Sequence, residues 1–424
     1  MIRHIKSLVL SMITPQKLLV RRSCFPANYT NLLKSMPTME YSKTPNGLNV
    51  VTEERECYNT CIGYFFDNGS RYEEPPENGF YADCLCEDVP VVFDILTDCL
   101  FNNLLSSAEI ELQKHTVYQE MIEHDKNTKN LVDDYLHATA FQGTPLAQTV
   151  MGPSHNLYHF KTSSICSYRE RTLDPTRIVL AAVGGIKHEQ LLQLATCLDR
   201  LPPGKCMAPI PYRYTGSEMS YRNDTIPVAH VAIAVEGPHY CSRDNLPMTL
   251  AAAIVGGWDK SQAGGLDVST RVARSASTSQ LCDSYKAFNL SYKDTGLWGV
   301  QFIAPKLVVD DMVGVVQDEW MRLCTMIPEG EVERAKAELT TKLLTNSQSN
   351  SKTCRAIAKW VLYNKYKTSL FEQLCAIEAI KVQDLKEICN KYLYDKCPAV
   401  TAVGATECMP EYTRVRAGMY WLRY

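Results

Sequence analysis

A few side chains in the sequence are spaced so that they could bind a metal ion. In LQKHTVYQEMIEHDKN, Glu120, Glu123 and His124 fall at positions i, i+3 and i+4, so they share one face of the expected helix. A weak divalent cation site could form there, but a solvated acidic helix face has the same spacing, and we predict that face. His137, in the apolar stretch YLHATAF, is predicted to be a core histidine with satisfied hydrogen bonds.

Cysteine is frequent, with 17 residues in a chain of 424. The odd count and the length do not resemble a small secreted disulfide framework, so we expect reduced thiols. Cys57 with Cys61, and Cys84 with Cys86, could form half of a zinc site. However, neither pair has a CxxC spacing or a matching pair of histidines. We therefore expect these cysteines to pack as small hydrophobic side chains.

The composition is that of an ordinary globular chain with 45% hydrophobic and 21% charged residues, long enough for two or three domains. The net charge of -3 gives no basic field that would hold a polyanion, so no nucleic-acid partner is expected. The apolar run VAIAV at 231–235 has the length of a strand and is far shorter than a membrane span. The chain is therefore expected to be soluble.

The N-terminal segment has the composition of a mitochondrial presequence. No Asp or Glu precedes Glu40, but several basic residues occur there among serines and threonines: Arg3, Lys6, Lys17, Arg21, Arg22 and Lys34. In MIRHIKSLVLSMI, apolar residues recur on one helical face, and Pro15 follows shortly afterwards. The apolar core of a secretory signal is missing. We predict a presequence over residues 1–30 and import into mitochondria.

An internal repeat organises the rest of the chain. Residues 87–114 run parallel to residues 309–336 at an offset of about 222 residues. RIVLAAVGG (177–185) resembles PAVTAVGA (398–405) at an offset of about 220 residues. Both regions predict that the second half of the chain is a structural copy of the first.

The copy is incomplete in the first half. CIGYFFDNG (61–69) resembles HVAIAVEGP (230–238) at an offset of only about 169 residues, so the first half is about 50 residues short. The deficit lies between Asp67 and Asp88. There the second half has two helix signals, DNLPMTLAAAIVGG with an Asp cap and VSTRVARSAS, and then two strand signals, LCDSYKAFNLSY and GLWGVQFIAP. The first half is therefore predicted to lack two helices and most of a hairpin.

Four stretches carry a resemblance that extends over nearly the whole chain: YLHATAFQGTPLAQ, AHVAIAVEGP, KYLYDKCPAV and MYWLRY. They resemble the core proteins of mitochondrial respiratory complex III, which are similar to the β subunit of mitochondrial processing peptidase in the pitrilysin-type family. The resemblance implies an α+β fold of two homologous pitrilysin-like domains, each an antiparallel sheet with helices on one face, the first shortened by about 50 residues. We expect domains at 35–200 and 217–424, joined by a Pro-rich linker at 201–216.

Peptidases of this family carry the motif H-x-x-E-H on the first helix of the first domain. Its two histidines hold Zn²⁺, its Glu acts as general base, and a Glu further along the chain is the third ligand. The family's motif follows a turn like GSRYE, found here in GSRYEEPPENG (69–79), but the motif itself is missing. Glu120 matches the third ligand. None of the nine histidines begins the motif: His4, His115, His124, His137, His155, His159, His188, His230 and His239.

We therefore expect no catalytic residue, no metal ligand and no cofactor. The resemblance implies a non-catalytic scaffold subunit on the matrix side of the mitochondrial inner membrane, with a second core protein and other subunits of respiratory complex III as partners. One alternative is a β-type processing peptidase subunit, a zinc endopeptidase that removes presequences together with an α-type partner. Another is a shortened paralogue, or the product of a wrongly spliced gene, that no longer assembles.

The deficit also affects stability. Losing two helices uncovers apolar sheet surface, so we expect the first half to be marginally stable without a partner. The second half, which keeps all its elements, is expected to fold independently.

Overall fold

A computed structural model describes residues 37–67, 78–200, 212–262, 264, 268–364 and 370–420. The chain divides into two compact units. Residues 37–367 and 380–424 form one unit; the other contains helix α13 (Leu370–Ala379), which is described by itself. The expected presequence, and residues 201–211 of the expected linker, lie outside the described residues. Below, the first half means residues up to 200 and the second half means residues from 212.

The first half contains a five-stranded sheet in the order β1-β2-β5-β3-β4. Strands β2 and β5 are parallel and the other neighbours are antiparallel. The strands are β1 (Met39–Lys43), β2 (Asn49–Glu54), β3 (Asn59–Phe66), β4 (Asn78–Leu85) and β5 (Ile178–Gly184). The helices are α3 (Val89–Phe101), α4 (Ser107–Lys126), α5 (Thr128–Ala140), α6 (Thr162–Thr172) and α7 (His188–Ala195).

The second half contains a six-stranded sheet in the order β6-β11-β7-β10-β9-β8, in which only β6 and β11 are parallel. The strands are β6 (Glu218–Arg222), β7 (Val228–Glu236), β8 (Gly257–Asp259), β9 (Ser284–Ser291), β10 (Gly296–Pro305) and β11 (Ala399–Gly404). The helices are α8 (Asn245–Val255), α9 (Arg271–Ser279), α10 (Val309–Thr325), α11 (Glu329–Gln348), α12 (Asn350–Asn364), α14 (Val382–Leu393) and α15 (Tyr412–Ala417).

The two sheets share a common plan. In each, a central strand lies between a parallel and an antiparallel neighbour: β5 lies between β2 and β3, and β11 lies between β6 and β7. Residues 67–77 join β3 directly to its neighbour β4, whereas residues 237–295 join β7 to β10 and form α8, β8, α9 and β9. The α+β class is thus confirmed, and so is the prediction that the first half lacks two helices and most of a hairpin. Strand β4 is consequently an edge strand.

One detail of the predicted helix α8 is wrong. Asp244 precedes the helix as expected, but its side chain caps no backbone N–H group. Instead, its Oδ2 atom accepts hydrogen bonds from Lys391 Nζ at 2.6 Å and from the Tyr392 hydroxyl at 3.0 Å. Both donors lie on α14. Asp244 therefore marks the start of the helix as predicted, but its carboxylate binds α14 and does not cap α8.

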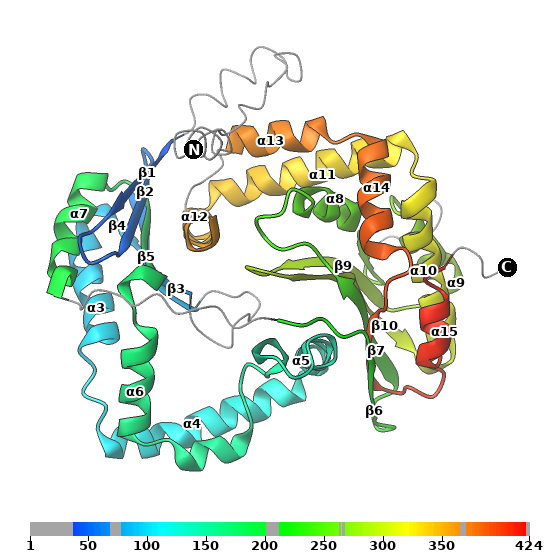
Figure 1. Cartoon of the computed structure of the whole chain (residues 1–424), viewed down its shortest axis with the longest axis horizontal. Helices are drawn as coiled ribbons and strands as arrows, with labels where there is room; N and C mark the ends of the chain where they lie inside the picture. Colours follow the sequence, from blue (N-terminus) through cyan, green and yellow to red (C-terminus); the bar gives the residue numbers. More distant parts are fainter. Residues whose placement is uncertain are drawn as a thin grey trace, which may run out of the picture. The chain divides into compact units, whose positions relative to one another are not determined.

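Helix α12 of the second half packs on the sheet of the first half (Figure 1). Its side chains Cys354, Ile357, Ala358 and Val361 are almost fully buried. They form one apolar cluster with strand residues of β2, β3 and β5: Val51, Cys61, Phe65, Val179, Ala181 and Val183. One face of the first sheet is therefore completed by a helix that begins only at Asn350, far along the sequence from the last strand of that sheet.

Helix α5 of the first half makes the reciprocal contact (Figure 1). Its residues Val132, Leu136 and Ala140 are buried in a cluster with strand residues of the second sheet: Ala232, Ala234, Leu297, Ala399 and Val403. Helices α5 and α12 begin at Thr128 and Asn350, the same offset that relates the two halves elsewhere. Equivalent helices are thus exchanged between equivalent sheets.

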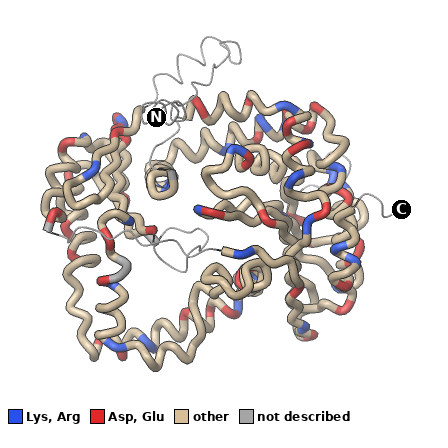
Figure 2. Tube along the Cα trace, in the orientation of Figure 1, with Lys and Arg blue, Asp and Glu red and all other residues tan. Residues whose placement is uncertain are grey.

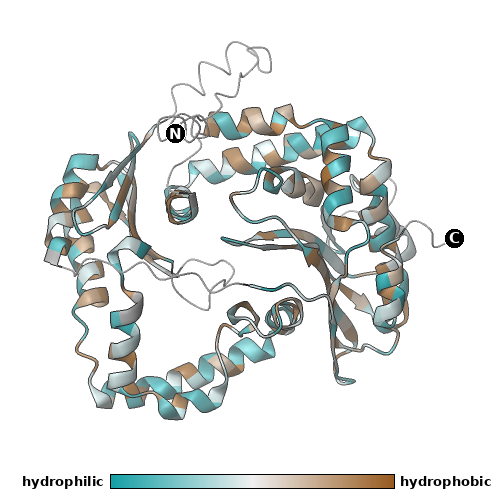
Figure 3. Cartoon of the chain, in the orientation of Figure 1, coloured by the Kyte–Doolittle hydropathy of each residue, from teal (hydrophilic) through white to brown (hydrophobic). Residues whose placement is uncertain are grey.

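Other helices cover the opposite faces. Helices α3 and α7 contribute Val89, Phe93 and Leu191 to a cluster with Val50 and Ile62 of the first sheet. On the second sheet, Trp298 of β10 lies against Trp320 of α10, with ring centroids 5.4 Å apart. Figure 3 shows hydrophobic stretches in both sheets. We expected helices on one face of each sheet only, and this expectation is wrong. A helix of each half covers the second face of the other half's sheet.

A buried ion pair fixes α12 at the end of β2. Arg55 Nη2 lies 2.7 Å from Glu53 Oε1, and both side chains are largely buried. The same guanidinium donates hydrogen bonds to Asn350 Oδ1 at 3.1 Å and to Thr353 Oγ1 at 3.0 Å, both on α12. A charged group buried at this depth is tolerated because its donors are satisfied. The ion pair therefore couples the first sheet to the second half.

A histidine joins α5 to the second half. His137 Nδ1 is hydrogen-bonded to the Asp133 carbonyl at 2.7 Å, and its Nε2 to the hydroxyl of Tyr292. Burial lowers the pKa of His137, and burial raises the pKa of the Asp133 carboxyl to about 6. His137 is therefore a satisfied structural histidine, as predicted, but it lies between the halves.

We predict that the two halves unfold together, which revises the expectation that the second half folds alone. Replacing Ile357 by Ala should lower the free energy of unfolding by about 2–5 kcal/mol, because it leaves a cavity under the first sheet. All five tryptophans lie in the second half, so urea denaturation followed by tryptophan fluorescence reports on that half. Hydrogen exchange of the β5 amides reports on the first sheet.

Both signals should shift to the same lower urea concentration. Ile95→Ala is a matched control, because this α3 side chain is 56% exposed and its truncation should change stability by less than about 0.5 kcal/mol. An unchanged fluorescence transition, with faster exchange in β5 alone, would show that the halves are independent.

We also predict a loss of stability on acidification that depends on His137. Its folded-state pKa is lowered, so protons bind the unfolded chain more readily, and stability falls as the pH drops below about 6.5. Asp133 acts in the opposite direction, since its raised pKa adds stability as the pH falls below about 6. His137→Gln should therefore flatten the loss between pH 7.5 and 5.5 in urea denaturation, and Asp133→Asn should steepen it. Equal slopes in all three proteins would contradict the assignment.

Candidate functional site

The side chains first considered as metal ligands lie on α4, a helix whose N-terminus is capped by Ser106 Oγ, which accepts a hydrogen bond from the Glu109 amide. Glu120 and Glu123 are exposed. His124 is half-buried, with Nδ1 4.0 Å from Asp134 Oδ2 on α5 and 3.7 Å from Asp125 Oδ1. The acidic face therefore lies in solvent, while the imidazole turns toward the adjacent helix.

These residues do not fit the catalytic zinc of the family's peptidases. Such a site needs three fixed protein ligands and an open position for water. In the described part of the chain, no three His, Cys, Asp or Glu side chains lie close enough together to hold a metal ion. Glu120 stands alone as the counterpart of a ligand. No step of zinc chemistry can be assigned to the described residues.

The cysteines considered as half of a zinc site are free thiols, as are the other described cysteines. Cys84 Sγ donates to the Thr60 carbonyl at 3.6 Å, and Cys86 Sγ donates to the Tyr58 carbonyl at 2.9 Å. Burial raises the pKa of the Cys84 thiol, which favours the neutral form. Cys61 is buried beneath α12. These contacts are those of packed side chains, in agreement with the expectation of reduced thiols.

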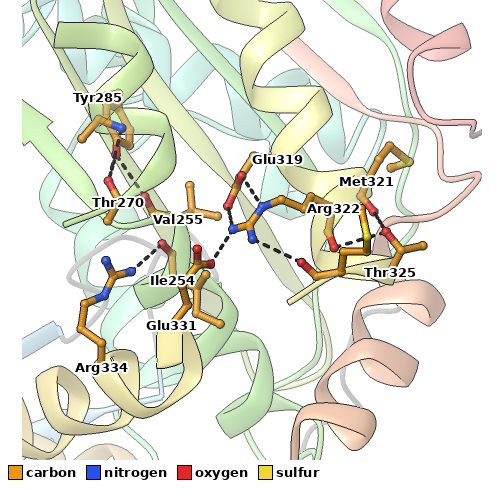
Figure 4. Close-up of polar contacts among 12 residues, drawn as sticks. Ile254, Val255, Thr270, Tyr285, Glu319, Met321, Arg322, Thr325, Glu331 and Arg334 are labelled. Atoms are coloured by element: carbon orange, nitrogen blue, oxygen red, sulfur yellow. Dashed lines mark hydrogen bonds and ion pairs between the residues drawn. The ribbon is translucent and has the colours of Figure 1, made fainter. Parts of the chain in front are cut away.

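Helix α8 of the second half shows where the corresponding helix, which the first half lacks, would lie (Figure 4). The carboxyl end of α8 is held by two donors: the Tyr285 hydroxyl bonds to the Val255 carbonyl at 3.1 Å, and Arg334 Nη2 bonds to the Ile254 carbonyl at 3.5 Å. Trp298 Nε1 donates to the carbonyl of Met248 at 2.9 Å. Helix α8 is thus anchored to β9, β10 and α11.

An ion-pair network lies beside α8. Arg322 of α10 donates to both carboxylate oxygens of Glu319, at 2.9 and 2.5 Å, and to Glu331 Oε2 of α11 at 2.6 Å (Figure 4). Its hydrogen bond to Glu319 raises the pKa of the guanidinium, which stays charged. Glu319 is buried, so the network ties α10 to α11 where solvent has little access.

The first half does not reproduce this network. Strands β4 and β10 end at Leu85 and Pro305, and α3 and α10 begin at Val89 and Val309, so the offset over these helices is 220 residues and not the 222 deduced from the sequence. Asn102 therefore stands at the position of Arg322. Helices α4 and α11 begin at Ser107 and Glu329, which places Glu109 at the position of Glu331. The acidic residue is therefore kept while the arginine is not. Within the described residues, Glu109 takes part in no ion pair.

The uncovered surface forms a groove of about 550 Å³ bounded by the end of α3, by α4 and by α6. Its apolar lining includes Leu105, Ile110, Val117, Leu157, Phe160 and Ile165. This groove was not predicted from the sequence. Its signal was present: Ile110 and Val117 occupy positions where α11 carries the buried residues Val332 and Leu339.

The described surface gives no sign of a membrane span or of a polyanion site. None of the described helices combines the length and the hydropathy needed to cross a bilayer. Figure 2 shows acidic and basic residues interspersed along the chain, without a large region of one sign. This distribution agrees with the small net charge of -3.

Family models match both halves of the chain. The model described as insulinase (peptidase family M16) matches residues 77–154, and the model described as peptidase M16 inactive domain matches residues 160–339. The first match begins at residue 77, at the end of the short connection between β3 and β4. The matched part of the first half therefore starts after the interval in which the deficit lies.

Curated relatives extend over almost the whole chain. Cytochrome b-c1 complex subunit 1 of Mus musculus and of Bos taurus are each 36% identical, covering 94% of this chain and 93% of the relative. The β subunit of mitochondrial processing peptidase from Bos taurus is 34% identical, covering 92% of this chain and 89% of the relative. A chain in the solved structure "Complex III2 from Candida albicans, Inz-5 bound" is 25% identical, with a TM-score of 0.82 and coverage of 90% of this chain and 99% of that chain.

The alignment with the mouse protein also reflects the deficit. It extends over 445 positions but includes 94% of 424 residues, or about 399, so about 46 aligned positions have no residue in this chain. That number is close to the deficit deduced from the internal repeat. The identity to these relatives over nearly the full length, the two matching family models and the shared fold lead to one conclusion. This chain belongs to the insulinase, or M16, peptidase family.

Proposed function

We propose that the chain is a non-catalytic scaffold subunit of mitochondrial respiratory complex III, on the matrix side of the inner membrane. The relatives named cytochrome b-c1 complex subunit 1 support this function, because they match almost end to end. A solved structure with the same fold is of complex III. The partners would be a second core protein and other subunits of that complex.

The direct pairing of β3 with β4 carries the non-catalytic part of the proposal. In the second half, the interval between the corresponding strands contains α8, β8, α9 and β9, whereas in the first half only residues 67–77 lie between β3 and β4. The family's peptidases place their metal-binding helix in that interval. Residues 67–77 contain no histidine, so this interval cannot supply the two histidine ligands of the zinc motif.

We also propose the domain boundaries 35–200 and 217–424, with a linker at 201–216 and a presequence at 1–30. The described strands of each sheet fall inside these ranges. The presequence is supported by the absence of acidic residues and the basic residues near the N-terminus. Because each sheet is covered by a helix of the other half, we expect these domains to be units of sequence repetition that fold as one body.

We predict that the tagged chain, expressed in mitochondria, comigrates with complex III in native gels and copurifies with a second core protein. Arg55→Ala should reduce its recovery in the complex, because it breaks the buried pair that holds α12 on the first sheet and costs about 3–5 kcal/mol. Arg222→Ala is the matched control, since this guanidinium is exposed and its ion pairs contribute little. Recovery only with an α-type processing peptidase subunit would favour the alternative function, and recovery with neither would favour a non-assembling paralogue.

We further predict that the purified chain, mixed with an α-type processing peptidase subunit and zinc, cleaves presequence peptides no faster than the α-type subunit alone. Activation of water requires three protein ligands and an open position, and Glu120 supplies at most one ligand. A processing peptidase β subunit with an intact H-x-x-E-H motif serves as the positive control. A metal-dependent rate that Glu120→Gln abolishes would contradict the prediction.

A further inference from the structure

The groove between α3, α4 and α6 has an equivalent in the second half, where it is filled. There, α8 packs against α11 and α14, the helices that correspond to α4 and α6. Val332 and Leu339 of α11 are 1% and 6% exposed, and Leu385 of α14 is fully buried. The repeat thus shows that a helix covers this surface when it is present.

The first half keeps the apolar character of that surface. Ile110, Val117 and Ile165 stand at the positions of Val332, Leu339 and Leu385, and all three are only half-buried. Together with Leu157 and Phe160 they line the groove. Apolar side chains kept on an open groove are typical of a binding surface.

The charges of the groove indicate what would bind. Glu109 stands where Glu331 accepts a hydrogen bond from Arg322, but the arginine is replaced by Asn102, whose Nδ2 donates to Asp98 at 3.1 Å. Lys114, the one basic residue of the lining, is paired with Glu111 at 2.6 Å. The carboxylates of Asp98 and Glu109 both line the groove. No arginine or lysine of the groove lining forms an ion pair with Glu109.

We propose that this groove binds an α-helix of a partner protein, which takes the place that α8 takes in the second half. The helix would present an apolar face of about three turns, the length of α8, and a Lys or Arg that pairs with Glu109. Packing of an apolar helical face into a groove supplies the affinity, and the charge pair sets the orientation. The inference rests on the repeat and the groove and does not depend on the proposed function.

The test uses the full chain and two fluorescein-labelled helical peptides, each of about five turns, which is long enough to form a helix and to span the groove. Both peptides carry leucine and alanine on one face and glutamine on the other; one has a single lysine at the edge of the apolar face and the other has glutamate there. Fluorescence anisotropy should show saturable binding of the lysine peptide. Val117→Asp should weaken it at least tenfold, and Glu109→Gln about fivefold while removing the preference over the glutamate peptide.

Leu112→Asp is the matched control, because this residue is 71% exposed on the same helix and does not line the groove. It should leave the affinity unchanged, and thermal unfolding followed by circular dichroism checks that each variant is folded. The proposal is overturned if neither peptide binds saturably, or if Leu112→Asp and Val117→Asp have equal effects. It is also overturned if the chain self-associates and Val117→Asp dissociates it, because the occupant of the groove would then be a second copy. If the peptide binds only after residues 1–36 are removed, the occupant would be the chain's own N-terminal segment, which likewise overturns the proposal.

Discussion

The exchange of α5 and α12 is the constraint on which the rest of the structure depends. Each sheet is apolar on both faces, and each half supplies helices for only one of them from its own residues. The second face of the first sheet is closed by α12 and that of the second sheet by α5. Neither half can bury its strands completely without the other. The Arg55 and His137 contacts lie at these two helices, where misplacement would expose both cores.

The same constraint explains how the first half tolerates its deficit. The missing helices would have lain on the face covered by α3, away from the face closed by α12. Val91 and Ile95 of α3 are 60% and 56% exposed, so apolar surface of this helix is open to solvent. The losses are therefore confined to an edge strand, one helix surface and the groove. A subunit that acts by contact with its neighbours can use such surfaces, whereas a peptidase cannot do without its metal helix.

The sequence predicted the repeated elements well because their hydrophobic runs recur at an offset of about 169 residues before the deficit and of about 220 residues after it. The runs at 61–69 and 230–238 became β3 and β7, and the interval lacking in the first half became α8, β8, α9 and β9 in the second. It could not predict the exchange, since an offset shows which helices are equivalent but not on which sheet each one packs. It also could not predict the groove, because the half-burial of Val117 depends on the absence of a neighbouring helix. Asp244 shows a third limit, since a capping residue can instead bond to a distant lysine and tyrosine.

The distance along the chain between the first sheet and α12 has a consequence for biogenesis. During vectorial synthesis or translocation, β1 to β5 emerge long before residue 350, so one apolar face of the sheet stays open during that interval. Contacts of such long sequence separation form slowly and expose surfaces that aggregate. The nascent chain should therefore need a chaperone to hold the first half until α12 arrives. A chain terminated before residue 350 would remain a client of that chaperone or be degraded.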